Sequence, residues 1–486
     1  MDYNYLITFI PSIIFIINIL LAVGFLFLER RDIGYTWAWL MVLYFIPILG
    51  FVVYLFLGRN LKQKNFYKLS AEERDYLQSE VDKQLPIAGD EEIRHSPLLS
   101  KYADLIEMNL RSSHSLWSDD NEIIIFDDGH EKFDSLFEGI RAAKKEINIQ
   151  YYIIQPDSLG KKLRDELTLK AKEGVKVRLL YDEVGSKKIS RKFFQELRVA
   201  GGEVEVFFPS LFKLVNFRIN NRNHRKLCII DGEIAYIGGF NIGDEYLGLN
   251  KKFGYWRDTH FRIEGTSVNQ IQGRFILDWN QARKDKSESH EEFGFSYHIK
   301  RHIGTSPVQI VSSGPNSETE HLKNMYIKLI LSAKQSVYIQ TPYFIPDASF
   351  MDACKIALLS GVDLRIMIPN KPDHPFVYWA TWAHAGELLE YGAKVLLYEK
   401  GFLHAKTIVV DGEVSSVGTM NIDSRSFKLN FEVNAIVYDE KVARPLQELF
   451  DKDSIVSTEL TIERYTQRSL KIKFKEGISR LLSPIL

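Results

Sequence analysis

Two His-x-Lys pairs are the residues of this chain best suited to chemistry on a phosphate group, and both belong to a repeated pattern. Each pair is followed, at the same distances, by Asp-Gly-Glu, a glycine and an asparagine. Every residue of the second copy lies 180 positions after its counterpart, since 404 − 224 = 180. The copies are His224, Lys226, Asp231, Gly232, Glu233, Gly238 and Asn241, and His404, Lys406, Asp411, Gly412, Glu413, Gly418 and Asn421. One pair could arise by chance, but two copies of a seven-residue pattern indicate one phosphate site built from two halves.

The pattern supplies the groups that attack on a phosphodiester requires. The negative oxygens of the phosphate repel a nucleophile, and Lys226 and Lys406 can neutralise that charge. Asn241 and Asn421 can donate amide hydrogens to the same oxygens. A neutral imidazole can then attack phosphorus while a protonated one donates to the leaving alcohol. Histidine suits both roles because its ordinary pKa is about 6.5. The repeat makes the two histidines equivalent, so the pattern alone does not say which one attacks.

Strands are expected to position these side chains. In a strand, side chains two positions apart share a face, so the histidine and lysine of each pair project together. The apolar runs 227–230 and 407–410 predict buried strands immediately afterwards. Each run ends in an Asp-Gly dipeptide, which is typical of a turn. We therefore favour a structural role for Asp231 and Asp411, although both are kept in the candidate catalytic set.

The order of apolar runs along the chain indicates an α/β fold. Residues 146–154 and 176–181 read as strands, and residues 161–173 between them read as a helix. Such alternation predicts βαβ units and mixed sheets flanked by helices. Because both halves repeat this order, we expect two similar lobes, 115–300 and 301–486, related by a pseudo-twofold axis.

The N-terminal region is predicted to form a hairpin of two membrane helices over residues 1–60. Residues 3–28 and 33–58 contain no charged side chain, and each stretch can cross a bilayer core of about 30 Å. A cleaved signal peptide is disfavoured because a second apolar stretch follows at once. Basic residues after the second stretch favour a cytoplasmic catalytic part at the cell membrane. Residues 61–114 read as a partly helical linker.

Composition narrows the range of partners. The net charge is −1, so the chain lacks the global basic field that is typical of nucleic-acid binders, and we expect no nucleic-acid partner. Cys228 and Cys354 have no neighbouring ligand pattern, so we expect neither a metal site nor a disulfide. Oligomeric state stays open.

The repeated pattern resembles the paired His-Lys-Asp motif of the phospholipase D superfamily. Four further strings, together with the N-terminal region, make the chain similar to the bacterial cardiolipin synthases. They are Gly254-Tyr255-Trp256-Arg257-Asp258-Thr259-His260, Gly401-Phe402-Leu403-His404-Ala405-Lys406, Asn421-x-Asp423-x-Arg425-Ser426 and Arg480-Leu481-Leu482-Ser483-Pro484. One departure is that the family often has serine after the motif glycine, where this chain has Gly239 and Thr419.

The resemblance implies a covalent phosphohistidine with no metal or cofactor. It implies His224 as the nucleophile and His404 as the general acid and then base. Each imidazole should also need a carboxylate that holds its tautomer. The resemblance points to Glu432, 28 residues after His404, since 432 − 404 = 28. The same offset from His224 reaches Lys252, so Asp258 is the candidate acid of the first half.

The implied reaction joins two phosphatidylglycerol molecules into cardiolipin and glycerol. Transfer to water would instead make the protein a membrane-bound phospholipase D, and another acceptor would make it a different phosphatidyltransferase. A tethered nuclease and an inactive lipid-binding scaffold are further alternatives. A basic cluster before the first motif is either a solvated loop or a surface that attracts anionic headgroups. It consists of Arg218, Arg222, Arg225 and Lys226.

Overall fold

The computed structural model describes most of the chain beyond the N-terminal region. The described residues are 13, 16, 17, 19, 20, 33–46, 50, 54, 66, 67, 69–85, 96–209, 220–283 and 303–483. They belong to two compact units, 1–61 with 209–221, and 62–208 with 222–486. The first unit contains helix α2 (Ile33–Phe45). Most of the predicted membrane hairpin lies outside the described residues, and no helix within them is long and apolar enough to cross a bilayer.

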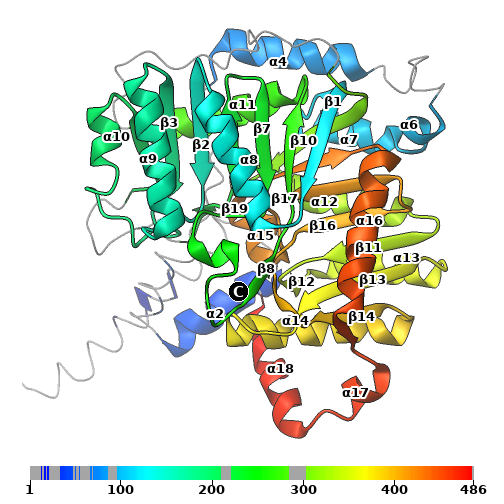
Figure 1. The fold of residues 1–486 in the computed structure, drawn as a ribbon. Helices are drawn as coiled ribbons and strands as arrows, with labels where there is room; N and C mark the ends of the chain where they lie inside the picture. Colours follow the sequence, from blue (N-terminus) through cyan, green and yellow to red (C-terminus); the bar gives the residue numbers. More distant parts are fainter. Residues whose placement is uncertain are drawn as a thin grey trace, which may run out of the picture. The chain divides into compact units, whose positions relative to one another are not determined.

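The described residues of the second unit form a sheet of 16 strands, of which 15 follow one another in a continuous order and β5 (Arg222–Asn223) pairs with β19 beside it. Figure 1 shows the arrangement of the sheet. The two central strands of this order, β1 and β10, pair in antiparallel fashion. Counted outward from them, the first seven strands of each half occur in corresponding order, and the second half adds β20 at its edge. Outward in the first half the strands are β1 (Trp117–Phe126), β9 (His260–Glu264), β7 (Ile234–Gly238), β6 (Leu227–Ile230), β2 (Glu146–Tyr151), β3 (Lys176–Asp182) and β4 (Glu203–Phe207). Outward in the second half they are β10 (Ser306–Ser313), β19 (Asn430–Val437), β17 (Val414–Gly418), β16 (Thr407–Val410), β11 (Ser336–Gln340), β13 (Asp363–Pro369), β14 (Lys394–Tyr398) and β20 (Ser457–Glu459).

The sheet is mixed in both halves. The strand triplets β2-β3-β4 and β11-β13-β14 are parallel, whereas the strands nearer the centre are antiparallel. The α/β class with mixed sheets is therefore confirmed. The two predicted lobes share one sheet, and the mirrored strand order reflects the sequence repeat.

Helices cover both faces of the sheet. In the first half they are α8 (Gly129–Ala142), α9 (Ser158–Lys172), α10 (Gln195–Val199) and α11 (Ser267–Ala282). In and around the second half they are α12 (His321–Ser332), α13 (Ala348–Leu359), α14 (Pro375–Glu387), α15 (Ser424–Lys428), α16 (Glu440–Ile455), α17 (Ile462–Thr466) and α18 (Leu470–Leu482). The segment before β1 forms α4 (Ala71–Gln84), α6 (Pro97–Lys101) and α7 (Ala103–Ser113).

Alternation along a central strand explains this layering. In β2, Ile147 and Ile149 enter the apolar core beneath α8 and α9. The alternate residue Gln150 donates to Asp278 of α11 on the other face. The second half repeats the arrangement, because Ile339 of β11 enters the core with α12 and α13 while Gln340 donates to Asp453 of α16. Figure 1 shows α8, α9 and α16 on the near side of the sheet.

The N-cap residues of equivalent helices are also the same in the two halves. Asp157 is the N-cap of α9 and accepts a hydrogen bond from the backbone N–H of Gly160. Asp347 is the N-cap of α13 and accepts from that of Phe350. An aspartate at this position satisfies an amide that the first turn leaves without a partner.

Two short parallel pairings link the halves outside the main ladder. Strand β5 (Arg222–Asn223) pairs with the start of β19, and β15 (Gly401–Leu403) pairs with β8 (Tyr255–Arg257). In each case the first strand named ends immediately before a motif histidine. The remaining short elements are β12 (Phe344–Ile345), β18 (Ile422–Asp423), and the 3-10 turns η2 (Asp244–Leu247) and η3 (Leu388–Tyr391).

Candidate active site

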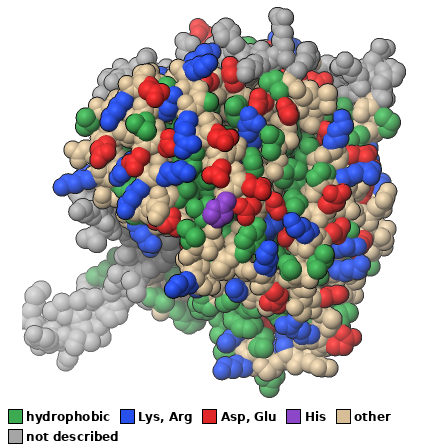
Figure 2. Space-filling view, in the orientation of Figure 1, with side chains coloured by type: hydrophobic (Ala, Val, Ile, Leu, Met, Phe, Trp, Pro, Cys, Tyr) green, Lys and Arg blue, Asp and Glu red, His purple; other side chains and the backbone are tan. Residues whose placement is uncertain are grey.

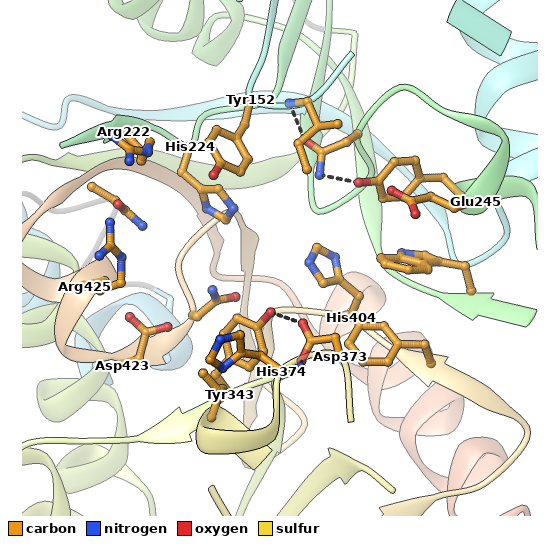
Figure 3. A pocket seen from close by; sticks show the side chains of 18 of the residues that line it. Tyr152, Arg222, His224, Glu245, Tyr343, Asp373, His374, His404, Asp423 and Arg425 are labelled. Carbon is orange, nitrogen blue, oxygen red and sulfur yellow. Dashed lines mark hydrogen bonds between the residues drawn. The ribbon is translucent and has the colours of Figure 1, made fainter. Parts of the chain in front are cut away.

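The two motif histidines line the same cavity, which has a volume of about 590 Å³ (Figure 3). Both lie deep in the wall, with 8% of His224 and 9% of His404 exposed. The backbone N–H of His224 donates to the carbonyl of Phe431 at 2.9 Å, and that of His404 donates to the carbonyl of Arg257 at 2.7 Å. Each histidine is therefore fixed by a strand from the opposite half.

The candidate acids are exchanged between the halves in the same way. His224 Nδ1 lies 3.0 Å from both carboxylate oxygens of Glu432, and His404 Nδ1 lies 2.6 Å from Asp258 Oδ2. The sequence analysis sought one acid for each histidine in its own half. The structure instead pairs each acid with the histidine of the other half, because β5–β19 and β8–β15 cross between the halves.

The two acids are structural counterparts despite their different offsets. The N–H of Gly239 donates to the carbonyl of Thr259, and the N–H of Thr419 donates to that of Val433, so the preceding residues Asp258 and Glu432 correspond. The interval from the motif histidine to the acid is six residues longer in the first half than in the second, since 258 − 224 = 34 and 432 − 404 = 28. A repeat search that allowed this insertion would have matched them.

Gly239 departs from the family pattern for a steric reason. A Cβ at this position would lie 1.9 Å from Asp258 Oδ1. Only glycine leaves room for the carboxylate that contacts His404. In the second half Thr419 fits, and its hydroxyl donates to the carbonyl of Val433 at 3.2 Å.

The motif lysines are buried directly behind the histidines. Lys226 Nζ donates to the carbonyl oxygen of His224 at 2.6 Å, and Lys406 Nζ donates to that of His404 at 2.5 Å. Burial lowers the pKa of Lys226 to about 7 and that of Lys406 to about 8. An entering phosphate would stabilise the protonated form of both lysines.

Burial favours the neutral form of both histidines. Burial lowers the pKa of His404 to about 3, with Lys406 adding to the effect and Asp258 opposing it. Burial also lowers the pKa of His224, against the opposing charge of Glu432. Burial alone would raise the pKa of Asp258, but Lys406 and His404 outweigh it and the pKa is lowered. Both imidazoles are therefore paired with ionised carboxylates through Nδ1.

The two motif asparagines line the cavity but have different partners. Asn241 Oδ1 accepts from the N–H of Ile153 at 3.1 Å, and its Nδ2 donates to the hydroxyl of Tyr246 at 3.1 Å. Asn421 Oδ1 is buried and makes no hydrogen bond within the described part of the chain.

The motif aspartates lie at the far ends of the strands that follow the histidines, and neither lines the cavity. Asp231 accepts from the backbone amides of Lys144, Lys145 and Glu146. Asp411 accepts in the same way from the amides of Lys334, Gln335 and Ser336. Both adopt a left-handed backbone with φ of 55°. Each carboxylate ties a motif turn to the start of the neighbouring strand, β2 or β11.

The basic cluster before the first motif does not form one surface. Arg222 lines the cavity. Arg225 is buried and donates to both oxygens of Asp278, at 2.7 and 2.6 Å. Arg218 lies outside the described residues. Figure 2 shows acidic and basic side chains intermixed on the face in view.

Several cavity residues were not singled out as site residues from the sequence. They are Tyr152, Glu245, Trp256, Tyr343, Asp373, His374, Asp423 and Arg425. Trp256, Asp423 and Arg425 do occur in the family-like strings, and that was the available signal. Among the described residues, no cluster of His, Cys, Asp or Glu is arranged to hold a metal ion.

Comparison with known proteins is consistent with this geometry. A family model described as "Cardiolipin synthase, PLD-like domain" matches residues 136–279 and 326–454, and one described as "Phospholipase_D-nuclease N-terminal" matches residues 10–59. The chain is 54% identical to the "Major cardiolipin synthase ClsA" of Bacillus subtilis (strain 168) over 477 residues, 98% of each protein. It is 52% identical to the cardiolipin synthase of Oceanobacillus iheyensis over 473 residues, 97% of this chain and 98% of that protein.

A solved structure shares the fold at much lower identity. The phosphatidylserine synthase of Haemophilus influenzae Rd KW20 superposes with a TM-score of 0.59 at 16% identity. The superposition covers 75% of this chain and 95% of that one.

Proposed function

Because this chain belongs to the cardiolipin synthases of the phospholipase D-like type and is a phosphatidyltransferase, we propose that its paired histidines carry the transfer through a covalent phosphohistidine. The donor and the acceptor are both phosphatidylglycerol, and the products are cardiolipin and glycerol. The observation that supports this proposal most strongly is the pair of imidazoles in one cavity, each contacting a carboxylate of the other half.

In the first step, His224 Nε2 attacks the phosphorus of the donor. The P–O bond to glycerol breaks, and His404, whose pKa rises once the donor phosphate is bound beside it and which is then protonated, donates a proton to the leaving oxygen. In the second step, neutral His404 takes the proton from a hydroxyl of the acceptor. That oxygen attacks phosphorus, and the P–N bond to His224 breaks. One phosphodiester replaces another, so the exchange needs no energy donor.

The residues around the two histidines set the tautomer of each imidazole and stabilise the negative charge of the bound phosphate. Because Nδ1 of each imidazole donates to its carboxylate, Nε2 is left to attack or to transfer a proton. The phosphate oxygens bring negative charge to Lys226 and Lys406, which raises the pKa of both lysines and keeps them protonated. The amide groups of Asn241 and Asn421 complete the shell around the phosphate.

The N-terminal region would hold this cavity at the bilayer. We infer that residues 3–28 and 33–58 form two membrane helices and that the catalytic unit lies in the cytoplasm. Labelling of single introduced cysteines in spheroplasts, with membrane-impermeant reagents, tests this topology. Labelling of the catalytic unit from outside intact cells would contradict it.

The function is tested with detergent-solubilised protein and phosphatidylglycerol as the sole lipid. Mass spectrometry should find cardiolipin and glycerol in equal amounts, and neither product should form with His224→Ala. Phosphatidic acid with glycerol would identify a hydrolase instead. Absence of turnover would contradict phosphatidylglycerol as the donor.

A further inference from the structure

Helix α18 (Leu470–Leu482) presents its apolar side to the outside of the protein. A surface helix normally packs its apolar side against the core and leaves its polar side in water. In α18 the inward side carries Glu476 and Ser479, of which only 3% and 1% is exposed. Four apolar side chains, three or four positions apart, form a stripe along the outward face, which we call the α18 stripe. They are Leu470, Phe474, Ile478 and Leu481, with exposed fractions of 84%, 69%, 38% and 82%.

Polar contacts fix which side of α18 faces inward. Arg468, just before the helix, donates from Nε to both carboxylate oxygens of Glu476, at 2.9 and 2.8 Å. The hydroxyl of Ser469, the N-cap, accepts from the backbone N–H of Ile472 at 3.4 Å. A largely buried ion pair is costly to break, so α18 cannot turn its apolar side inward without a loss of stability. The exposure of the stripe is therefore built into the fold.

Helix α18 packs against α14, the helix that borders the catalytic cavity (Figure 1). Lys475 Nζ lies 4.9 Å from the centroid of the Trp379 ring, and the hydroxyl of Ser483 lies 3.5 Å from His384 Nε2. Val377, in the first turn of α14, lines the cavity that contains the motif histidines. A surface that binds the α18 stripe is therefore held close to a wall of this cavity.

Basic side chains border the α18 stripe on both sides. At about 100° per residue, Lys471 and Lys475 follow one edge of the stripe, and Lys473 and Arg480 follow the other. All four are exposed, whereas the one acid of the helix, Glu476, is buried on its inward side. An apolar face with basic edges matches an anionic bilayer surface, because the ammonium groups reach the headgroup phosphates while the apolar side chains enter the lipid. A second copy of α18 would instead bring basic edges together.

We propose that α18 docks on an anionic bilayer surface through the α18 stripe, with lipid phosphate groups bound along its basic edges. This contact belongs to the catalytic unit itself and is additional to the membrane helices inferred for the N-terminal region. It holds the cavity wall formed by α14 near the lipid surface. The docking requires negative surface charge and not a particular headgroup, so it does not depend on the identity of the donor or on the covalent mechanism.

The test places a fluorophore beside the α18 stripe in the full-length protein. The native thiols, Cys228 and Cys354, are buried, and burial raises the pKa of each to about 12, so a maleimide should modify only an introduced cysteine. Gly477→Cys carries nitrobenzoxadiazole next to the stripe, where an added Cβ has open space around it. Lys441→Cys, at an exposed position of α16, carries the same label as the matched control. Both proteins are reconstituted in nanodiscs of phosphatidylcholine, with or without phosphatidylserine and with or without bromine on the acyl chains.

Phosphatidylserine should shift the emission of the label at residue 477 to shorter wavelength, and bromine should then quench it at least about twofold, because the stripe enters the boundary of the acyl chains. The control label should show neither effect. Replacing Lys471 and Lys473 together with glutamine should lower the docking equilibrium constant about 25-fold, at about fivefold for each lysine. Lys441→Gln combined with Arg444→Gln, which removes two exposed charges from α16, should leave this constant unchanged.

Two results would overturn the inference. A shift that bromine does not quench would show that protein covers the stripe, either a second copy or another segment of this chain. Emission that is the same with and without phosphatidylserine would show that anionic lipid is not the partner. The measurement needs no catalytic turnover, so its failure is distinguishable from failure of the proposed reaction.

Discussion

The two half-sites have the same plan but differ in how firmly the histidine is held. The acid next to His224 is Glu432, which also accepts from the hydroxyl of Ser426 and the amide of Asn430. The acid next to His404 is the shorter Asp258, which contacts the imidazole at 2.6 Å and accepts from one further donor, the backbone N–H of Thr259, at 2.8 Å. The sequence repeat therefore conserves the reacting groups, while their supporting groups have diverged.

The difference suggests a division of labour. A histidine fixed by an acid that is itself held by two donors suits a nucleophile, whose ring must not move during attack. A histidine whose Nδ1 also lies 2.9 Å from the Lys406 ammonium group suits proton transfer, because an entering phosphate that offsets this positive charge changes its pKa. Four measurements can sharpen or break this comparison.

Removing either imidazole is expected to have the largest effect. His224→Ala and His404→Ala should each lower cardiolipin formation at least about 10⁴-fold, because one loses the nucleophile and the other the proton transfer. With His224 as the nucleophile, only His404→Ala should accumulate a phosphatidyl adduct, on residue 224. Intact-protein mass spectrometry after mixing with phosphatidylglycerol detects it. The control His321→Asn, away from the cavity, should be fully active. An adduct that forms only in His224→Ala would make His404 the nucleophile and His224 the general acid.

Replacing either of the carboxylates that contact the histidines is expected to have the second-largest effect. Glu432→Gln and Asp258→Asn should each lower activity about 10²–10³-fold, since the amide no longer stabilises the imidazolium. Glu432 raises the pKa of His224, so Glu432→Gln should lower it further. NMR of ¹³C-labelled histidine, assigned with His224→Ala, measures this shift. A shift confined to His404 would contradict the exchange of acids between the halves.

The lysines should show opposite effects on activity and stability. Lys226→Met should lower activity about 10²-fold by removing charge from the phosphate site.

In the folded protein the pKa of Lys226 is about 7, against an ordinary 10.5. The unfolded chain therefore binds more protons between these values, and stability without substrate should rise with pH there. The unfolding midpoint of Lys226→Met should be higher than wild type near pH 7 and depend less on pH. Identical pH profiles would disprove the burial argument, and Lys252→Met, at an exposed lysine, is the control.

The motif aspartates should affect activity least. Asp231→Ala and Asp411→Ala should each destabilise the protein by about 1–3 kcal/mol, because backbone amides lose their acceptor. The activity of folded protein should stay within about twofold of wild type. The loss should be larger for Asp411, which also pairs with Lys101 at 2.8 Å. Urea unfolding measures the free energy of unfolding of each variant. In a Lys101→Met background, the destabilisations caused by Asp411→Ala and Asp231→Ala should become more similar. A folded variant with much weaker activity would place the carboxylates in the chemistry.

Much of the site could be predicted because the repeat is local in sequence. The spacing His-x-Lys and the apolar runs 227–230 and 407–410 predicted that each pair would sit at the start of a buried strand, and β6 and β16 are those strands. The turn position of Asp231 and Asp411 likewise favoured a structural role for both residues. These features depend on residues within about ten positions of each other.

The exchange between the halves could not be predicted, because it depends on pairings between distant strands. Nothing near Arg222 indicates that β5 pairs with a strand more than 200 residues later. The six-residue insertion before Asp258 also concealed its correspondence to Glu432. Asp373 and His374 are not part of the repeat, and only the tertiary fold places them at the cavity.

The exchange of acids also sets when activity can first appear during synthesis. The carboxylate that contacts His224 follows it by 208 residues, in a strand close to the end of the catalytic unit. The first half leaves the ribosome with its histidine, lysine and asparagine complete, yet it lacks both the strand that fixes His224 and its acid. A growing chain thus stays inactive until β19 has been made and has joined the sheet.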